Sequence, residues 1–256
     1  MSSHTGRRGF LARFSAAAAA FAAAPMLATP LSAAERHADG DDPEPWLRAL
    51  RGKHRQLFHS HDRMDATVLW QARAFIDLYE KSYGVKSSDL SVVIAAHGQT
   101  GGMLFNDALW SKYELGRMYR VTMREPSTDV PAAQPAPMPV TDAKASDAKP
   151  ADAKPAWPPA GRVAATRNVF HTGRAGDPVN DQTSIVALQK LGVTFLLCDN
   201  ALKQFSGYVA RKSGSTPEQA HEELRSNLVP GTVLVPTMLI AINRAQEKGC
   251  SYLYSG

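Results

Sequence analysis

The sequence predicts an α/β fold in three layers, with helices on both faces of a parallel five-stranded β-sheet. Segments with strand character alternate along the chain with segments of helical periodicity, and strands separated by helices pair in parallel. Three strand segments, VVIAA, VTFLL and TVLV, are unbroken apolar runs, as expected for strands buried on both faces. Apolar residues make up 44% of the 256 residues, which is enough for a substantial core.

The first half of the domain predicts two strands and two helices. Residues 55–58 are expected to form the first strand, and residues 92–96 the apolar centre of the second. Between them, apolar residues recur with helical spacing at 68, 69, 72, 75, 76 and 79, and Gly84 follows as a helix end. A short helix is expected within 106–116, ending at Gly116.

The second half continues the alternation of helices and strands. Strands are expected at 193–198, 231–236 and 251–255. Helices are expected at 181–192, 200–214, 215–228 and 237–249. Gly207 predicts a break in the second of these helices. Ser215 or Thr216 as a cap, followed by Pro217, is typical of the start of the third.

The N-terminal residues 1–34 are typical of a twin-arginine export signal. Arg7 and Arg8 precede a hydrophobic pair and a weakly apolar, alanine-rich stretch. Small residues at 32–34 favour cleavage after Ala34. We therefore expect export by the twin-arginine pathway and a periplasmic location, with a flexible lead-in at 35–52 and the folded domain at 53–256.

Charge argues against nucleic acid as a partner. The formal net charge is +5, but the first 34 residues hold three arginines and no acid. Without them, 26 Lys and Arg residues face 24 Asp and Glu residues, and no basic stripe interleaved with aromatic residues is seen. We expect no nucleic-acid partner and, after signal cleavage, no membrane attachment.

Residues 125–161 interrupt the predicted domain. This segment consists largely of proline, alanine, aspartate and lysine, and DAK recurs at 142, 147 and 152. Such a composition cannot bury enough apolar surface to offset the entropy of ordering. We interpret it as a disordered surface insertion, and deletion of about 129–158 should leave the melting temperature nearly unchanged.

Candidate functional residues gather where the predicted strands end. Ligands of open α/β sheets bind beyond the carboxyl ends of the strands. Side chains expected at or near this edge of the sheet are His59, His61, His97, Asn168, His171, Cys198, Asp199 and Asn200. Sequence spacing alone would not bring them together, but the inferred topology does.

Cys198 is the leading candidate for chemistry. A cysteine at the N-terminal end of a helix faces the positive end of the helix dipole, which favours the nucleophilic thiolate. The alternative is an inert buried cysteine. His97 could serve as a proton partner or as a hydrogen-bonded structural residue, and Cys250 is expected to be inert. A second kind of site, with His59, His61, His97 and Cys198 holding zinc or copper, stays open.

Several of these segments resemble the DsrE/DsrF-like family of sulfur-handling proteins. VTFLLCDNALK and LVPGTVLVPTMLIAINRAQEKGCSYLY carry the likeness, and KHRQLF, VVIAAHG, NDALWSKYELG and TRNVF resemble its exported, twin-arginine branch. In the leading hypothesis His97 could act as the proton partner of Cys198, and Asp199 and Asn200 offer backbone N–H groups. The resemblance itself implies the sheet order 4-3-2-1-5 and a persulfide on Cys198. It implies no cofactor, a sulfur donor or acceptor protein as partner, and a homo-oligomer.

The leading functional hypothesis is therefore a periplasmic sulfur carrier or sulfurtransferase-like protein. The alternatives are a protein that binds a metal or small ligand, with Asn168 and His171 as further ligand residues, and a scaffold that keeps the fold without sulfur transfer. We also predict no disulfide between Cys198 and Cys250. These residues lie at opposite edges of the predicted sheet, and the family's strand order adds a lateral gap on the order of 14 Å.

Overall fold

The computed structural model describes residues 44–124 and 156–256 of the chain. The expected signal at 1–34 lies outside the described residues, as do residues 35–43 of the expected lead-in and most of the expected insertion. Within the described ranges, no helix is both long enough and apolar enough to cross a lipid bilayer.

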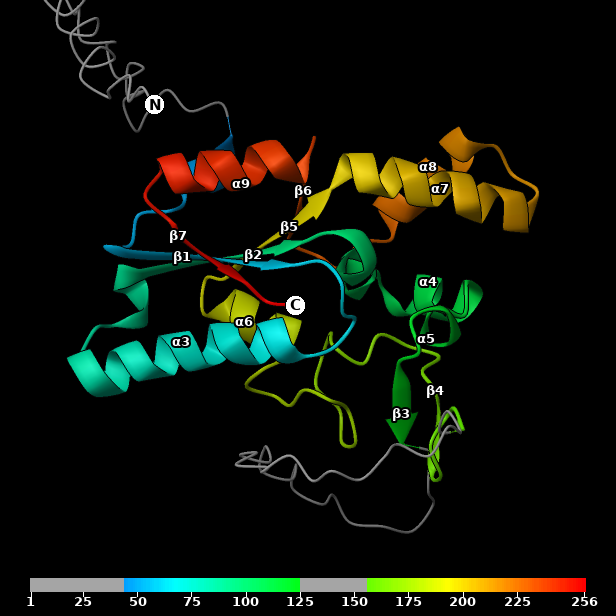
Figure 1. Cartoon of the computed structure of the whole chain (residues 1–256), viewed down its shortest axis with the longest axis horizontal. Coiled ribbons are helices and arrows are strands. Elements are labelled where there is room, and N and C mark those ends of the chain that lie inside the picture. Colours follow the sequence, from blue (N-terminus) through cyan, green and yellow to red (C-terminus); the bar gives the residue numbers. More distant parts are fainter. Residues whose placement is uncertain (1–43, 125–155) are drawn as a thin grey trace, which may run out of the picture. The chain divides into compact units, whose positions relative to one another are not determined.

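Five strands form one parallel sheet. They are β1 (His54–Ser60), β2 (Leu90–Ala96), β5 (Thr194–Cys198), β6 (Thr232–Val235) and β7 (Ser251–Tyr254). Their order is β6-β5-β2-β1-β7 (Figure 1), which is the predicted order 4-3-2-1-5 when these strands are numbered among themselves. All five carboxyl ends therefore lie along one edge, called here the carboxyl edge, and the opposite edge is the amino edge.

Helices and short 3₁₀ segments connect these strands. They are α2 (Pro45–Arg48), α3 (Thr67–Tyr83), η1 (Ser87–Asp89), η2 (Gly98–Leu104), α4 (Asp107–Lys112), α5 (Leu115–Met118), α6 (Ile185–Lys190), α7 (Asp199–Ser213), α8 (Pro217–Ser226) and α9 (Met238–Glu247). The predicted break at Gly207 is wrong, because α7 runs through it without interruption. An interior glycine costs about 1 kcal/mol relative to alanine, and the buried side chains Leu202, Val209 and Ala210 hold the helix on the core.

The single short helix predicted within 106–116 is in fact two helices, α4 and α5. Glu114 lies between them in the left-handed region, with φ of 48°. Gly116 does not end a helix but lies close to another segment. A Cβ at Gly116 would lie 2.1 Å from the carbonyl oxygen of Ala165. The glycine is therefore needed for this close approach of two backbones.

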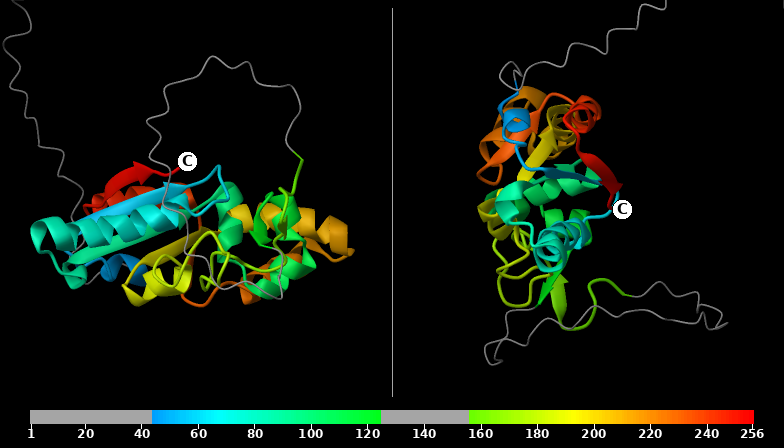
Figure 2. Two further views of the ribbon diagram at one scale, coloured as in Figure 1. Left: turned by 90° about the horizontal axis from the view of Figure 1, so that it is seen from below. Right: turned by 90° about the vertical axis from the view of Figure 1, so that its left-hand side faces the viewer.

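Helices cover both faces of the sheet, as predicted. Figure 1 shows α9 along one face and α3 and α6 along the other, and the side view in Figure 2 shows the same layering. Alternation along the strands divides the core accordingly. Leu57, Val93 and Leu196 pack with α2 and α9, whereas neighbouring strand residues pack with α3 and α6. Cys198 belongs to the α9 face.

One prediction needs correction, and one strand pair was not predicted. Part of the expected flexible lead-in is packed structure, because Trp46 and Leu47 of α2 are buried on the α9 face together with Leu50. The insertion is flanked by a strand pair that the sequence did not reveal: β3 (Thr122–Arg124) pairs antiparallel with β4 (Arg162–Ala164). Strands of three residues carry too little periodicity to be recognised.

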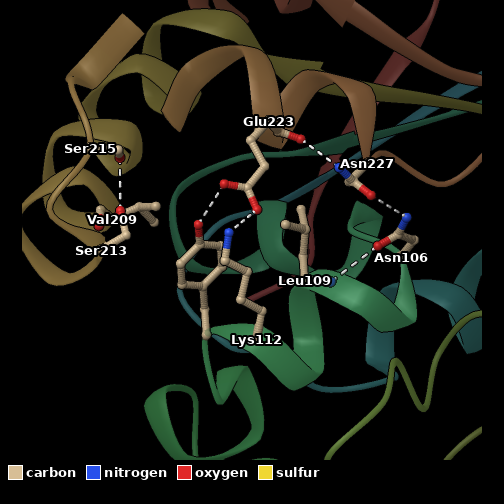
Figure 3. Close-up of polar contacts among 9 residues, drawn as sticks. Asn106, Leu109, Lys112, Val209, Ser213, Ser215, Glu223 and Asn227 are labelled. Atoms are coloured by element: carbon tan, nitrogen blue, oxygen red, sulfur yellow. Dashed lines mark hydrogen bonds and ion pairs between the residues drawn. The ribbon is translucent and has the colours of Figure 1, made fainter. Parts of the chain in front are cut away.

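Polar contacts fasten α8 to α4, as Figure 3 shows. Glu223 of α8 accepts hydrogen bonds from Lys112 and, at 2.9 Å, from the Tyr113 hydroxyl. Asn106 caps α4 by accepting from the amide of Leu109, and it donates to Asn227 at 2.9 Å. Because α8 in turn packs on α7, these contacts help to fix the start of α7, where Cys198 lies.

Candidate functional site

The sulfur of Cys198 lies between the N-termini of two helices. Cys198 is the last residue of β5 and the N-cap of α7, and only 2% of its surface is exposed. Its Sγ accepts two backbone hydrogen bonds, from the amide of Ala201 in α7 and from the amide of Met238 in α9, each at 3.4 Å. One sulfur atom thus serves the first turns of both helices.

Local sequence explains this arrangement. Cys198 pairs with Val235, the last residue of β6, so α7 and α9 both begin next to this pair of strand ends. Within the described residues, the side chain of Thr237, the N-cap of α9, makes no capping hydrogen bond. The Cys198 sulfur accepts from the first amide of that helix, Met238. The Asn200 amide donates to the Pro236 carbonyl at 3.3 Å and joins the two helix starts directly.

Two helix N-termini make this a favourable place for negative charge. The first amides of a helix have no partner within the helix, and their dipoles point toward an anion at the N-terminus. Thiolates of reactive cysteines are stabilised in the same way. The geometry is therefore suited to a nucleophilic sulfur, and it goes beyond the single helix end that the sequence predicted.

Asp199, predicted as a ligand residue, is instead bound to neighbouring side chains. Its carboxylate accepts from His221 of α8 at 2.8 Å and pairs with Lys203 at 2.7 Å. Burial acts to raise the pKa of Asp199, but the hydrogen bonds from Lys203 and His221 outweigh it, and the pKa is lowered. Asp199 therefore fastens the start of α7 to α8.

Sequence reasoning missed His221 as a partner near the site. Its place beside Ala220 and three residues before Leu224, both buried, was the available signal that it lies on the inner side of α8. The side chain of Asn200, another predicted ligand residue, is exposed and makes no hydrogen bond within the described residues. Its backbone amide contributes through the bond to Pro236.

His97 lies next to Cys198, but its ring faces other histidines. The last pair of the β2–β5 ladder is Ala96 with Leu197, so His97 and Cys198 follow as neighbours on the α9 face. No hydrogen bond joins them. The His97 ring lies 4.8 Å from that of His61 and 5.9 Å from that of His59, between centroids. Burial, and then His61, lower the pKa of His97.

The proposed metal set is not brought together. Among the described residues, no three His, Cys, Asp or Glu side chains are placed so that they could hold a metal ion. The sulfur of Cys198 is directed to the two helix amides, while His59, His61 and His97 contact one another. The sulfur and the three rings are thus two separate groups at the same edge of the sheet.

Asn168 and His171 belong to a different part of the domain. Both N–H groups of the Asn168 amide donate to carbonyl oxygens, of Met103 and Phe105, at 2.7 Å each. Its oxygen accepts from the Phe170 amide at 2.9 Å. Asn168 is therefore a buried structural residue. His171 lies beside Asp107 and Arg174; burial lowers its pKa, Asp107 opposes the change and Arg174 adds to it.

A small apolar cavity lies at the carboxyl edge on the side away from the sulfur. Its volume is about 50 Å³. It is lined by Gly98, Gly101, Gly102, Phe105, Tyr119, Leu197, Ala201, Leu202 and Phe205. A Cβ at Gly102 would lie 2.6 Å from the Tyr119 ring, so the glycine keeps the space open. Cys198 does not line this cavity, which is therefore no substrate pocket for its sulfur.

Cys250 differs from Cys198 in position and surroundings. It precedes β7 at the amino edge, and the strands β2 and β1 lie between β5 and β7. Both thiols are free, and the topology on which the disulfide argument rests is observed. Within the described residues no hydrogen bond reaches the Cys250 sulfur. Burial raises the pKa of Cys250 to about 11, with Arg55 opposing.

Comparisons of the chain with protein-family models, with curated proteins and with solved structures found no match. The α/β fold and its strand order are therefore known from the structure itself, and the site is inferred from the set of contacts that Cys198 makes.

Proposed function

We propose that the chain is a DsrE-like sulfur carrier that holds a persulfide on Cys198. The observation that carries the proposal is the pair of backbone amides, from Ala201 and Met238, that donate to the Cys198 sulfur. A purely apolar cysteine needs no such donors, whereas a thiolate or persulfide anion is stabilised by them.

The proposed step is a transfer between two sulfur compounds. The Cys198 thiolate attacks the outer sulfur of a donor persulfide. An S–S bond forms at Cys198 while the S–S bond of the donor breaks, and the donor leaves as a thiolate. The proton of the persulfide stays on the transferred sulfur, and no external oxidant or reductant is required.

Two further features support the assignment. The strand order matches the one implied by the resemblance to DsrE-like proteins, and Cys198 ends the third strand of that sheet, as the persulfide cysteine of the family does. The twin-arginine pattern at 1–34 supports a periplasmic location. Sulfur donors or acceptors in that compartment are then the partners.

Burial of the sulfur sets a condition on the donor. Met238 is fully buried above Cys198, and the two following residues, Leu239 and Ile240, are 76% and 59% exposed. These residues form the first turn of α9, which contacts the sulfur through the Met238 amide. A donor reaches Cys198 when this turn moves, and a small persulfide needs the least movement.

The test uses glutathione persulfide as a small donor. The full chain and the variants Cys198→Ser and Cys250→Ser are incubated with it, freed of excess donor, and assayed for bound sulfane sulfur by cyanolysis. We expect close to one sulfur per chain for the unmodified protein and for Cys250→Ser, and almost none for Cys198→Ser. Equal loading of the two variants would overturn the proposal.

A further inference from the structure

Three histidines meet at the carboxyl edge, away from the sulfur contacts. The rings of His59 and His61 at the end of β1 lie 6.3 Å apart, and that of His97 contacts both. The Nε2 atom of His59 is buried and has no hydrogen-bond partner in the part of the chain that the structure describes. On the doubly protonated ring, the Nε2–H group would therefore lack an acceptor.

The last strand is fastened to this cluster by its tyrosines. The Tyr252 hydroxyl lies 2.9 Å from Nδ1 of His59, and the Tyr254 hydroxyl donates to Asp62. The Ser255 amide donates to the His59 carbonyl at 2.8 Å. Among the strands of the described ranges, β7 is an edge strand that pairs only with β1, and all four of its residues are exposed. These contacts add to the backbone ladder that pairs it with β1.

The groups that face His59 mostly oppose its protonation. They are His61 and Asp62 from the end of β1, His97 from the end of β2, and the tyrosines of β7. Burial, then His97, then His61 lower the pKa of His59 to about 4, and Asp62 alone opposes them. When β7 moves away from His59, water reaches the ring, and the free-energy cost of protonating it falls.

We propose that the histidine cluster and β7 form an acid-sensitive latch, in which protonation of His59 releases the carboxyl end of β7 from β1. The proposal does not depend on sulfur transfer at Cys198. The sign follows from linkage: the closed latch disfavours the proton, so acid shifts the population toward the open latch. Asp62, tied to His61 and Tyr254, keeps the latch closed at neutral pH.

The test is amide hydrogen exchange of the full chain at pH 7 and pH 4.5, expressed as protection factors corrected for intrinsic exchange. If the pKa of His59 is about 4 with the latch closed and 6.5 with the ring fully free, the protection factor of β7 should fall roughly fiftyfold between pH 7 and pH 4.5. Because the ring is only partly solvated when the latch opens, we expect a fall of about tenfold. Peptides from β2 and β5 should change far less. Equal protection of β7 at both pH values would contradict the latch.

Two variants assign the effect to the cluster. His59→Gln keeps a group that can bond Tyr252 but cannot be protonated, and it should remove most of the pH effect. His54→Gln, at the amino end of the same strand, is the matched control and should keep it. If His59→Gln already loosens β7 at pH 7, the variant His97→Gln provides the test. It removes a group that opposes protonation of His59, so the acid-induced loss of β7 protection should become smaller. An unchanged loss in that variant would overturn the proposal.

Discussion

The two cysteines are similarly buried and belong to the same face of the sheet, yet their surroundings differ. Cys198, at the carboxyl edge, is 2% exposed and its sulfur accepts hydrogen bonds from two helix amides. Cys250, at the amino edge, is 6% exposed, and no hydrogen bond reaches its sulfur within the described residues. Burial raises the pKa of Cys250 to about 11.

The difference shows that two similarly buried thiols can have different polar surroundings. In a parallel sheet, helices begin at the carboxyl edge and end at the amino edge, so unpaired N–H groups gather at only one of them. A cysteine at the carboxyl edge finds donors for a negative sulfur, and one at the amino edge does not. The direction of the strands thus separates two otherwise similar residues.

The largest expected effect is on alkylation. With a pKa of about 11, roughly one Cys250 thiol in a thousand is ionised at pH 8. Iodoacetamide at pH 8 should therefore modify Cys198 first, and modification of Cys250 should rise about tenfold per pH unit up to pH 11. Peptide mass spectrometry of the full chain separates the two sites. Faster modification of Cys250 than of Cys198 at pH 8 would contradict the predicted order of reactivity.

A smaller effect is expected on stability. Cys198→Ala removes an acceptor that caps two helices, whereas Cys250→Ala removes only buried sulfur. Loss of an N-cap costs about 0.5–2 kcal/mol, so Cys198→Ala should lower the free energy of unfolding by about 1–2 kcal/mol more than Cys250→Ala. Urea denaturation measures this, and Cys198→Ser should recover part of the loss. Equal destabilisation by the two alanine variants would argue that the amide bonds contribute nothing.

Asp199, at the carboxyl edge, should make a contribution to stability that depends on pH. Its folded pKa lies below the ordinary 3.8, so its ionised form stabilises the protein above that value and the contribution is lost as pH falls through the folded pKa. Asp199→Asn should cost about 1 kcal/mol at pH 7, and this difference should shrink below pH 3.8. A difference that stays constant between pH 7 and pH 3 would show that the carboxylate charge plays no part.

The smallest effect is expected from the insertion. Deletion of 129–158 joins β3 to β4 and removes Trp157, whose ring lies 5.6 Å from the Arg120 guanidinium. Such a contact is worth about 0.5–1 kcal/mol at an exposed site. Deletion of 129–155 keeps Trp157 and serves as the matched control, with a melting temperature close to that of the full chain. A fall of many degrees in either variant would show that the segment packs on the domain.

Much of the fold could be predicted because its strands are apolar runs separated by helical periodicity. The carboxyl edge and the position of Cys198 at the start of α7 followed from this. The roles of Asn168 and Asp199 could not, because polar residues near strand ends are as often bound to backbone or to neighbouring side chains as to ligands. Asn168 holds the 103–105 segment, and Asp199 holds α8.

The second amide that donates to the Cys198 sulfur could not be predicted from the sequence either. Met238 lies 40 residues along the chain, and its approach depends on how β6 ends beside β5. The meeting of His59, His61 and His97 was expected from the topology, but the bonds between β7 and this cluster depend on side-chain positions. Pairing at an edge strand leaves no periodic signal that could have revealed them.

NMR of the ¹⁵N-labelled full chain tests whether the Cys198 sulfur accepts from both helix ends. The amide resonances of Ala201 and Met238 are followed while Cys198 is converted from thiol to thiolate by raising the pH. Both resonances should move together. Cys198→Ala should remove this response from both, while Cys250→Ala should leave it intact. Movement of only one resonance, or of neither, would contradict acceptance from both helix ends.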